Sequence, residues 1–204
     1  MKIAIYGRGG HAIEVYHQIK DTYSNSVISF VVDDQHYNNQ ENTIPFSYFK
    51  KDEQFNDYYF IIAIGDSKIR NKIVDKLPKN IKYFTFIHHS AILLDRKTIK
   101  IGEGSFVGAN CILTTNIEIG KHTILNRSVN VGHDCKIRDY FSAMPNVVIS
   151  GNVKIGNNVY CGNNSSVKEK IEICNNVIVG MNAAVVKNIE TGGTYVGVPA
   201  KKIK

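Results

Sequence analysis

The sequence predicts a two-part α/β protein, in which a Rossmann-like unit is followed by a parallel β-helix. From Ile101 onward the chain divides into fifteen consecutive six-residue blocks without an insertion. An aliphatic or small apolar residue leads each block, and seven of the fifteen second positions are glycine. A period of six fits neither a helix nor simple strand alternation, and three such blocks make one triangular coil of a β-helix. The blocks therefore predict five coils, preceded by about 85 residues in the order strand, helix, strand that is typical of a parallel α/β unit.

The first 85 residues contain three predicted strands and two predicted helices. The strands cover residues 2–6, 27–32 and 58–64, and the helices begin near residue 13 and run from about residue 68 to 77. A glycine-rich turn over residues 7–12 links the first strand to the first helix, and an Asn- and Gln-rich stretch after the second strand is predicted to be a loop. Asp66 or Ser67 can cap the second helix, which Pro78 ends.

Composition limits the class of function. The chain has 204 residues, 43% of them hydrophobic, and a net charge of +7 from 25 basic and 18 acidic side chains. The lysines are scattered without a basic run, which favours anionic small-molecule ligands over nucleic acid. Four cysteines lack close pairing and three occupy core-facing block positions, as expected for reduced thiols of a cytoplasmic protein. No apolar stretch approaches 18 residues, so neither a signal peptide nor a membrane span is predicted.

A candidate nucleotide site lies at the end of the first strand. Gly7, Gly9 and Ala12 have the spacing G-x-G-x-x-A, in which backbone N–H groups approach a phosphate at a helix N-terminus. Asp33 and Asp34 follow the second strand, where a carboxylate of a dinucleotide site binds ribose hydroxyls. A complete dinucleotide site is built from two mononucleotide-binding halves, and only one precedes the β-helix, so a complete dinucleotide site is not predicted. The alternative is a tight structural turn with two solvated aspartates.

His133 and Asp134 form a candidate catalytic pair. His133 occupies an outward-pointing third position of its block, and Asp134 follows it at once. A neutral imidazole can accept a proton, and a neighbouring carboxylate can fix its tautomer and raise its basicity. Sequence neighbours on a strand point to opposite faces, so the pair requires a backbone bend between the two residues. The alternative is a surface histidine on a turn.

Four other polar residues could have either a functional or a structural role. Asn126 replaces glycine at a second block position and could lie near His133 on the adjacent face; the alternative is an asparagine in a left-handed turn. His88 and His89 stand at the junction of the two parts, and His122 holds another outward position. Their spacing does not make three metal ligands converge, so no metal site is predicted and these histidines are expected to be structural or solvated.

The chain resembles the sugar O- and N-acyltransferases, the family of the sialic acid O-acetyltransferase and of the bacillosamine-pathway acetyltransferase that acts on a UDP-linked 4-amino sugar. The resemblance covers nearly all of the chain. It rests on the segments IYGRGGH (5–11), VVDD (31–34), IAIG (62–65) with IR (69–70), LN (125–126) seven residues before HDC (133–135), GNVKIG (151–156) and YVGVPAK (195–201).

This resemblance implies a left-handed β-helix and a homotrimer that binds acetyl-CoA between neighbouring β-helices. It makes His133 the general base and Asp134 its supporting carboxylate. Residues that it assigns to the nucleotide-sugar are Gly9, Gly10, His11, Asp33, Asp34, Gly65 and, near His133, Asn126. Residues that it assigns to acetyl-CoA are Ser142, Gly151, Asn163, Gly180 and Met181, with the N–H of Gly151 placed to stabilise the oxyanion.

The chain also departs from the family pattern. Relatives commonly carry a second histidine near acetyl-CoA where this chain has Ser142, and residues 143–146 replace a regular glycine-bearing turn. Lys68 stands where a bacillosamine-pathway relative has an acidic residue. These changes predict altered thioester contacts and a different sugar or nucleotide.

The resulting hypothesis divides the chain into a nucleotide-sugar-binding domain at 1–85, a β-helix at 86–190 and a C-terminal tail at 191–204. We expect a cytoplasmic, acetyl-CoA-dependent N-acetyltransferase that acts on a nucleotide-linked 4-amino-4,6-dideoxy sugar in bacterial surface polysaccharide or glycan synthesis, such as that of O-antigen. It needs no metal, because a neutral amine is already a competent nucleophile toward a thioester. Two alternatives remain open: an O-acetyltransferase for sialic-acid-type sugars, and a non-catalytic nucleotide-binding solenoid.

Overall fold

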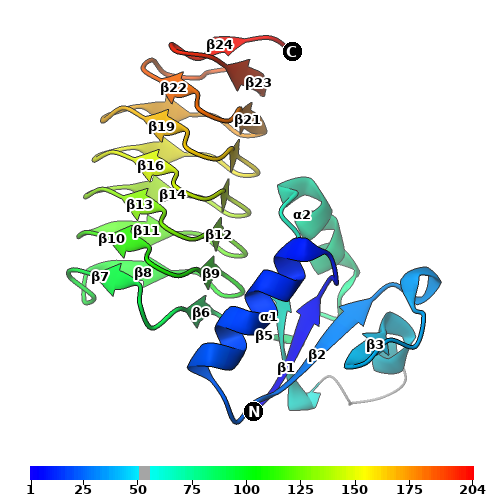
Figure 1. Cartoon of the computed structure of the whole chain (residues 1–204). Coiled ribbons are helices and arrows are strands. Elements are labelled where there is room, and N and C mark those ends of the chain that lie inside the picture. The colour runs from blue at the N-terminus through cyan, green and yellow to red at the C-terminus, as the bar shows by residue number, and fades with distance from the viewer. Residues whose placement is uncertain (51–55) are drawn as a thin grey trace.

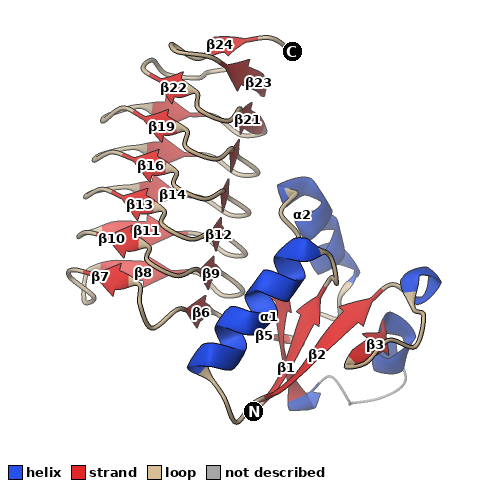
Figure 2. Cartoon of the chain, viewed as in Figure 1, coloured by secondary structure: helices blue, strands red, loops and turns tan. Residues whose placement is uncertain are grey.

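The computed structural model describes residues 1–50 and 56–204, and it confirms the predicted fold class. A small parallel sheet with two helices is joined to a left-handed parallel β-helix whose coils stack in a column (Figures 1 and 2). No helix among the described residues is both long enough and apolar enough to cross a membrane.

The N-terminal unit is a parallel sheet of five strands in the order β3-β2-β1-β4-β5. Its elements are β1 (Lys2–Tyr6), α1 (Gly10–Thr22), β2 (Val27–Val32), the 3-10 helix η1 (Asp34–His36), β3 (Thr43–Pro45), the 3-10 helix η2 (Phe46–Lys50), β4 (Tyr58–Ile62), α2 (Ser67–Lys76) and β5 (Lys82–Tyr83). The predicted strands at 2–6 and 27–32 are confirmed, and the third ends two residues earlier than predicted. The edge strand β3 is an addition to the prediction, since three residues ending in proline give too weak a strand signal.

The start of α2 follows from its cap. The Oδ1 atom of Asp66 accepts hydrogen bonds from the backbone N–H groups of Lys68 and Ile69 at 2.9 and 3.0 Å. Such a cap satisfies N–H groups that have no partner within the helix. The choice left open between Asp66 and Ser67 is therefore decided in favour of Asp66. Leu77 is the C-cap residue of α2, immediately before Pro78.

The β-helix confirms the six-residue blocks. Its strands are β6 (Phe86–Ile87), β7 (Ile92–Leu93), β8 (Ile99–Ile101), β9 (Phe106–Val107), β10 (Ile112–Leu113), β11 (Ile117–Ile119), β12 (Ile124–Leu125), β13 (Asn130–Val131), β14 (Lys136–Ile137), β15 (Ser142–Ala143), β16 (Val148–Ile149), β17 (Lys154–Ile155), β18 (Tyr160–Cys161), β19 (Ser166–Val167), β20 (Glu172–Ile173), β21 (Val177–Val179) and β22 (Ala184–Val185). The leading residues of the fifteen blocks fall on β8 to β22, and all but Ile101 are buried. Two further strands of the β-helix, β6 and β7, lie before Ile101, the predicted start of the repeats.

The three faces of the β-helix are separate parallel sheets. Face 1 contains β6, β9, β12, β15, β18 and β21; face 2 contains β7, β10, β13, β16, β19 and β22; face 3 contains β8, β11, β14, β17 and β20. Leu125 pairs with Ala143 on the next coil, so stacked positions lie 18 residues apart. The chain after residue 190 extends face 1, because β23 (Gly193–Val196) pairs in parallel with β21 and then turns back into the antiparallel β24 (Lys201–Lys202).

The two parts share an apolar core. Helix α1 packs against the sheet and against the first strands of face 1, where Phe86, Phe106 and Ile124 are buried (Figure 1). Rings of Phe86 and Phe106 stack with centroids 5.2 Å apart. Gln18 on α1 accepts a hydrogen bond from the backbone N–H of Ala109 at 2.9 Å. Because aliphatic and aromatic side chains from both parts are buried in one cluster, packing fixes the orientation of the N-terminal unit relative to the β-helix.

Arg70 on α2 is a buried charged group of this junction, with 1% of its surface exposed. Its guanidinium donates to five backbone carbonyls and one hydroxyl. The acceptors are Ile64 O, Gly65 O, His122 O, Tyr140 O, Phe141 O and Ser142 Oγ. Burial lowers the pKa of Arg70 to about 9, which still leaves the group charged at neutral pH. The rigid fork of an arginine is suited to this number of acceptors.

His122 is buried beside Arg70 and is therefore structural, one of the two roles expected for it. Only 3% of its surface is exposed, and its ring stacks on Tyr140 with centroids 5.4 Å apart. Burial, followed by the positive charge of Arg70, lowers the pKa of His122 to about 4. The imidazole is neutral at pH 7.

We expect the stability of the protein to fall as the pH is lowered from about 6.5 to about 4. Because the folded-state pKa of His122 lies below the ordinary value of 6.5, the unfolded chain binds the proton more tightly. The contribution of this neutral group is fully present above pH 6.5. Urea unfolding measured across this window should show a smaller loss of stability for His122→Phe, which keeps the aromatic stack. An unchanged pH slope in the variant would contradict this assignment.

Candidate functional site

The backbone bend that the His133–Asp134 pair requires is present. Both residues lie at the corner between β13 and β14, and Asp134 has a φ of 61°, in the left-handed region. The bend turns the two side chains toward each other, with His133 Nδ1 2.7 Å from Asp134 Oδ2. The His133 side chain is 62% exposed. A carboxylate that accepts from Nδ1 leaves Nε2 as the free proton acceptor.

Asn116 is a residue of this site that the sequence analysis missed. It lies one coil before Asp134 in the same column, and its Nδ2 donates to Asp134 Oδ1. The hydrogen bond from His133 and then that from Asn116 lower the pKa of Asp134, so the carboxylate stays charged at neutral pH. The block period could have found Asn116, because 116 and 134 differ by one coil of 18.

Gly151 lies directly against the imidazole from the coil above. A Cβ atom at this position would lie 2.5 Å from His133 Nε2 and 2.7 Å from Cε1, closer than packed atoms approach. The backbone of Asn152 donates to the carbonyl of His133 at 2.7 Å, which fixes the two coils relative to each other. The absence of a side chain at Gly151 therefore brings its backbone next to the proposed base.

The residues assigned to acetyl-CoA do not share one corner. Asn163 and Met181 stack one coil apart at the corner between faces 1 and 2, whereas Gly151 lies at the corner between faces 2 and 3. Met181 is 71% exposed. Gly180 also has a structural reason to be glycine, because a Cβ atom there would lie 2.7 Å from Val196 Cγ1 in the C-terminal tail. Within one chain, face 2 separates these two groups.

Asn126 does not lie beside His133 as the sequence suggested. It precedes β13 and His133 follows β13, so the two residues occupy opposite ends of that strand. Asn126 is 5% exposed, and its Oδ1 accepts from the backbone N–H of Arg127 at 2.7 Å. The spacing of one block plus one residue crosses a whole face of the coil, which is why the proximity fails within one chain.

Ser142 occupies the domain junction. It is fully buried, its Oγ donates to Gly65 O at 2.8 Å, and it accepts from Arg70 at 2.9 Å. Both capacities of the hydroxyl are used in holding α2 to face 1. The contact of Ser142 with acetyl-CoA remains a prediction, whereas these junction contacts are present.

The glycine-rich turn borders a hollow of about 490 Å³ on the N-terminal unit. Its lining includes Tyr6, Gly7, Arg8, Gly9, Asp33, His36, Asn38, Gln40, Ile64, Lys72 and Lys76. Gly7 has a φ of 112°, which favours glycine. In contrast, a Cβ atom at Gly9, Gly10 or Gly65 would meet no atom within 4 Å, so packing does not demand glycine at these three positions. Open space above the first turn of α1 is what a phosphate-binding turn requires.

The two aspartates after β2 have different surroundings. Asp33 lines the hollow and its Oδ1 accepts from the hydroxyl of Tyr6 at 2.8 Å. Asp34 Oδ1 accepts from the backbone N–H of Ser47 at 2.7 Å and so holds the segment after β3. His11, on the first turn of α1, packs edge-on against Phe106 of face 1, and burial lowers its pKa. Of the two aspartates, Asp33 is the one that lines the hollow.

A second hollow, of about 460 Å³, lies where the N-terminus of α2 meets face 1. Its lining is Gly65, Asp66, Ser67, Lys68, Met144, Asn158, Tyr160, Asn176 and Ile178. The buried Oδ1 of Asn158 accepts no hydrogen bond from the described part of the chain. Ile64 lines the first hollow, and its neighbour in sequence, Gly65, lines the second.

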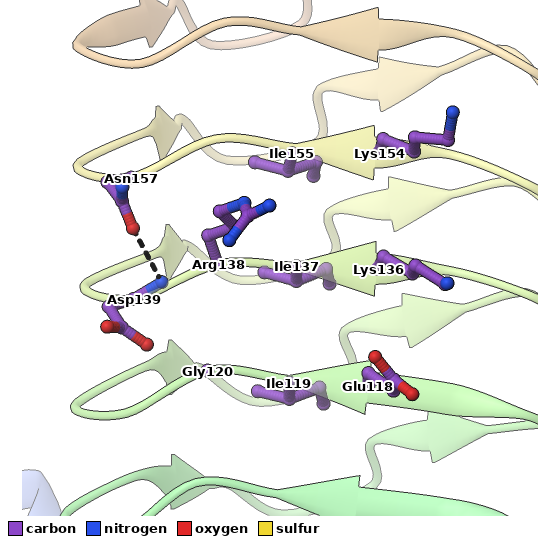
Figure 3. A pocket seen from close by; sticks show the side chains of 10 residues that line it. All are labelled: Glu118, Ile119, Gly120, Lys136, Ile137, Arg138, Asp139, Lys154, Ile155 and Asn157. Atoms are coloured by element: carbon purple, nitrogen blue, oxygen red, sulfur yellow. Dashed lines mark hydrogen bonds between the residues drawn. The ribbon is translucent and has the colours of Figure 1, made fainter.

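A third hollow lies on face 3 and has a different character (Figure 3). The isoleucines of successive coils stack here, and the outward side chains beside them are charged, among them Glu118, Lys136 and Lys154 (Figure 3). Lys154 pairs with Glu172 at 2.6 Å, and Lys100 approaches Glu118 to 3.6 Å. This face is a solvated charged surface and contains neither residue of the His133–Asp134 pair.

Neither of the first two hollows contains His133 or Asp134 in its lining. The corner between β13 and β14 lies on the side of the β-helix that faces away from the N-terminal unit (Figure 1). One chain therefore carries the proposed base and the ligand hollows on different sides.

The fold is that of a Rossmann-like N-terminal unit joined to a left-handed β-helix of hexapeptide repeats, the architecture of hexapeptide acetyltransferases. Residues 2–77 match the family model of the PglD N-terminal domain. This match confirms the resemblance to the sugar acyltransferases that the sequence motifs indicate.

Individual relatives agree with this class. The chain is 30% identical over 114 residues to GDP-perosamine N-acetyltransferase of Escherichia coli O157:H7, which covers 55% of this chain and 51% of the relative. The match thus spans about half the length of that curated relative. WeeI from Acinetobacter baumannii AYE superposes with a TM-score of 0.90 at 29% identity over all of both chains. The acetyltransferase domain of PglB from Neisseria gonorrhoeae FA1090, in complex with acetyl coenzyme A, gives 0.90 at 25% identity over 99% of this chain and 98% of that one.

Proposed function

We propose that this chain is an acetyl-CoA-dependent N-acetyltransferase that acts on a nucleotide-linked 4-amino-4,6-dideoxy sugar in bacterial surface-glycan synthesis. The observation that carries the proposal is the hydrogen-bonded pair His133–Asp134 on an exposed corner of the β-helix, with Gly151 against the imidazole. Names of similar proteins supply the chemistry, since one acts on GDP-perosamine and another binds acetyl coenzyme A.

The first hollow suits the nucleotide. The open N-terminal turn of α1 supplies backbone N–H groups and the positive end of a helix dipole for phosphate oxygens. Lys72 and Lys76 line the same hollow and add positive charge. Asp33 lies at the carboxyl end of β2, where a carboxylate can accept from ribose or base donors. The second hollow, which Gly65 lines, would receive the sugar, with Asn158 Oδ1 as an acceptor for a sugar hydroxyl or amine.

Asp33→Ala is expected to raise the KM for the nucleotide-sugar and to leave the KM for acetyl-CoA nearly unchanged. Loss of one polar contact to a ligand costs on the order of 1–3 kcal/mol, or about 5- to 150-fold in KM. Asp34→Ala is the matched variant, because Asp34 holds Ser47 and does not line the hollow. It should lower stability more than it changes the KM. Equal effects of Asp33→Ala on both substrates would point to a folding defect.

In the proposed reaction His133 Nε2 removes a proton from the attacking 4-amino group as the amine adds to the thioester. Asp134 remains ionised and stabilises the imidazolium that forms. The backbone N–H of Gly151, which lies next to the imidazole, would donate to the developing oxyanion. The proton on His133 then passes to the departing CoA thiolate.

We further propose that the chain forms a homotrimer with active sites shared between chains. The outward residues of face 2 carry no charge, and they are Ile92, Ile112, Asn130, Val148, Ser166 and Ala184. Face 3 is charged and face 1 is partly covered by the N-terminal unit, so face 2 is the surface suited to association. Association would bring the His133 corner of one chain to the hollows of its neighbour, and would join the two groups of acetyl-CoA residues that face 2 separates.

The shared-site arrangement predicts complementation between two inactive chains. Chains with His133→Ala lack the base, and chains with Asn158→Ala and Ser67→Trp would have the acceptor hollow blocked. After verified subunit exchange, mixed trimers should recover part of the activity, because some sites combine an intact corner with an intact hollow. An active monomer by sedimentation, or no recovery after exchange, would contradict this arrangement.

The activity itself is tested by release of the CoA thiol with a panel of UDP-, dTDP- and GDP-linked 4-amino sugars. Acetyl transfer to the 4-amino group of at least one donor, confirmed by mass spectrometry, is the expected result. Turnover with free sugar acids but not with nucleotide-linked amines would overturn the proposal in favour of an O-acetyltransferase. Ligand binding without CoA release would leave a non-catalytic binding protein.

A further inference from the structure

We propose that Asp21, His88 and His89 form a binding site for a transition-metal cation, with Zn²⁺ as the cation that its ligand set suits best. Asp21 lies near the end of α1, and the two histidines follow β6 on the first coil of the β-helix. One ligand atom from each residue lies within 4.8 Å of the others. The spacing of the histidines predicts no metal site here, because it does not include Asp21, which the docking of the two parts brings to His88 and His89.

The spacing of the ligand atoms supports a metal more than a set of direct hydrogen bonds. Asp21 Oδ2 lies 3.6 Å from His88 Nε2 and 3.5 Å from His89 Nδ1. Hydrogen bonds between nitrogen and oxygen are normally 2.7–3.2 Å long. Two ligands at 2.0–2.1 Å from a tetrahedral Zn²⁺ are separated by about 3.3–3.4 Å. Both measured separations lie close to this tetrahedral edge.

The surroundings of His88 supply the second hydrogen-bond partner that metal-bound histidines usually have. His88 Nδ1 lies 2.8 Å from Ser90 Oγ, and the backbone N–H of Asn110 donates to the same hydroxyl at 3.0 Å. The backbone N–H of Ser90 also donates to His88 Nδ1, at 3.1 Å, when the ring carries its proton on Nε2. Binding of a cation at Nε2 therefore requires the other tautomer, in which Nδ1 carries the proton and donates to Ser90 Oγ. Asp21 and His89 are exposed and His88 is buried, so a cation can enter from solvent and complete its coordination with water.

A cation at this position would link α1 to the first coil of the β-helix. It would add a further connection at the junction, at the end of α1 opposite to the glycine-rich turn. The expected consequence is a stabilised orientation of the N-terminal unit. This consequence does not depend on the proposed acetyltransferase activity.

The test titrates the metal-free full-length protein with ZnCl₂ and with CoCl₂. We expect saturable binding of one cation per chain, a visible Co²⁺ absorption band of tetrahedral intensity and a melting temperature that rises with Zn²⁺ concentration. Asp21→Asn and His89→Ala should each weaken Zn²⁺ binding on the order of tenfold or more, and Ser90→Ala by roughly tenfold. The metal-induced shift within each variant is compared, so that a change in basal stability does not enter the result.

His133→Ala is the matched control, because it removes an exposed histidine–aspartate pair elsewhere and should leave the metal response intact. Absence of saturable Zn²⁺ binding by the unaltered chain would overturn the proposal. The same conclusion would follow if Asp21→Asn and His89→Ala bound Zn²⁺ as tightly as the unaltered chain. In either case the three residues would be interdomain ion pairs only.

Discussion

Replacement of His133 by alanine is expected to lower kcat by about 100-fold or more, the usual scale for loss of a general base. His133 is exposed at its corner, its Nδ1 is held by Asp134, and its Nε2 is free to accept the proton of the amine. The affinity for acetyl-CoA and the folding of the chain should change little, because the side chain packs against no buried apolar cluster. The measurement is steady-state release of the CoA thiol.

Two further substitutions grade the contribution of the pair. Asp134→Asn should cost less than His133→Ala, since it removes charge and orientation but leaves the imidazole. Asn116→Ala should have the smallest effect, because Asn116 acts only by holding the carboxylate of Asp134. A His133→Ala variant that keeps more than about half of its activity at neutral pH would rule out His133 as the base.

Replacement of Arg70 by methionine is expected to lower the free energy of unfolding by about 3–5 kcal/mol, the scale for removing one partner of a buried charged network. Methionine has a similar length but no donor, so it would leave the carbonyls of His122 and Tyr140 without the guanidinium, whereas the Phe141 carbonyl keeps its hydrogen bond from the Ile124 N–H. Each unsatisfied buried acceptor costs about 1–3 kcal/mol before the structure relaxes. Urea unfolding at one fixed protein concentration measures the loss.

Arg127→Met is the matched control for Arg70. Arg127 also connects the β-helix to α1, through an ion pair with Glu14 at 3.4 Å, but its side chain is 55% exposed. An exposed ion pair contributes about 0–1 kcal/mol, so this variant should unfold close to the unaltered protein. Arg70→Lys should fall between the two, because an ammonium keeps the charge but cannot span six acceptors. If Arg70→Met and Arg127→Met were equally stable, Arg70 would not be what holds the junction.

The β-helix could be predicted almost completely from the sequence. Every block shows the six-residue period, because each leading residue packs in one apolar column and each coil repeats the contacts of the coil before it. The same repetition makes some side-chain contacts predictable, and both Asn116 below Asp134 and Gly151 above His133 follow from adding or subtracting 18. The turn of α1, the strands β1 and β2 and the cap at Asp66 are also local features that their own residues determine.

The roles of Ser142, His122, Asn126 and Asp34 were decided only by the tertiary structure. Ser142, predicted to contact acetyl-CoA, and His122, expected to be structural or solvated, both lie on the outside of the β-helix. The N-terminal unit docks over them, and Arg70 donates hydrogen bonds to Ser142 Oγ and to the His122 carbonyl. Docking of the N-terminal unit on the β-helix depends on contacts between residues that are far apart in the sequence. A local repeat in the sequence therefore does not predict it. The same holds for Asp21 with His88 and His89, which come together because α1 packs against the first coil. The sequence therefore determined the repeating fold and the His133–Asp134 pair, while long-range packing determined which polar residues remain open to a ligand.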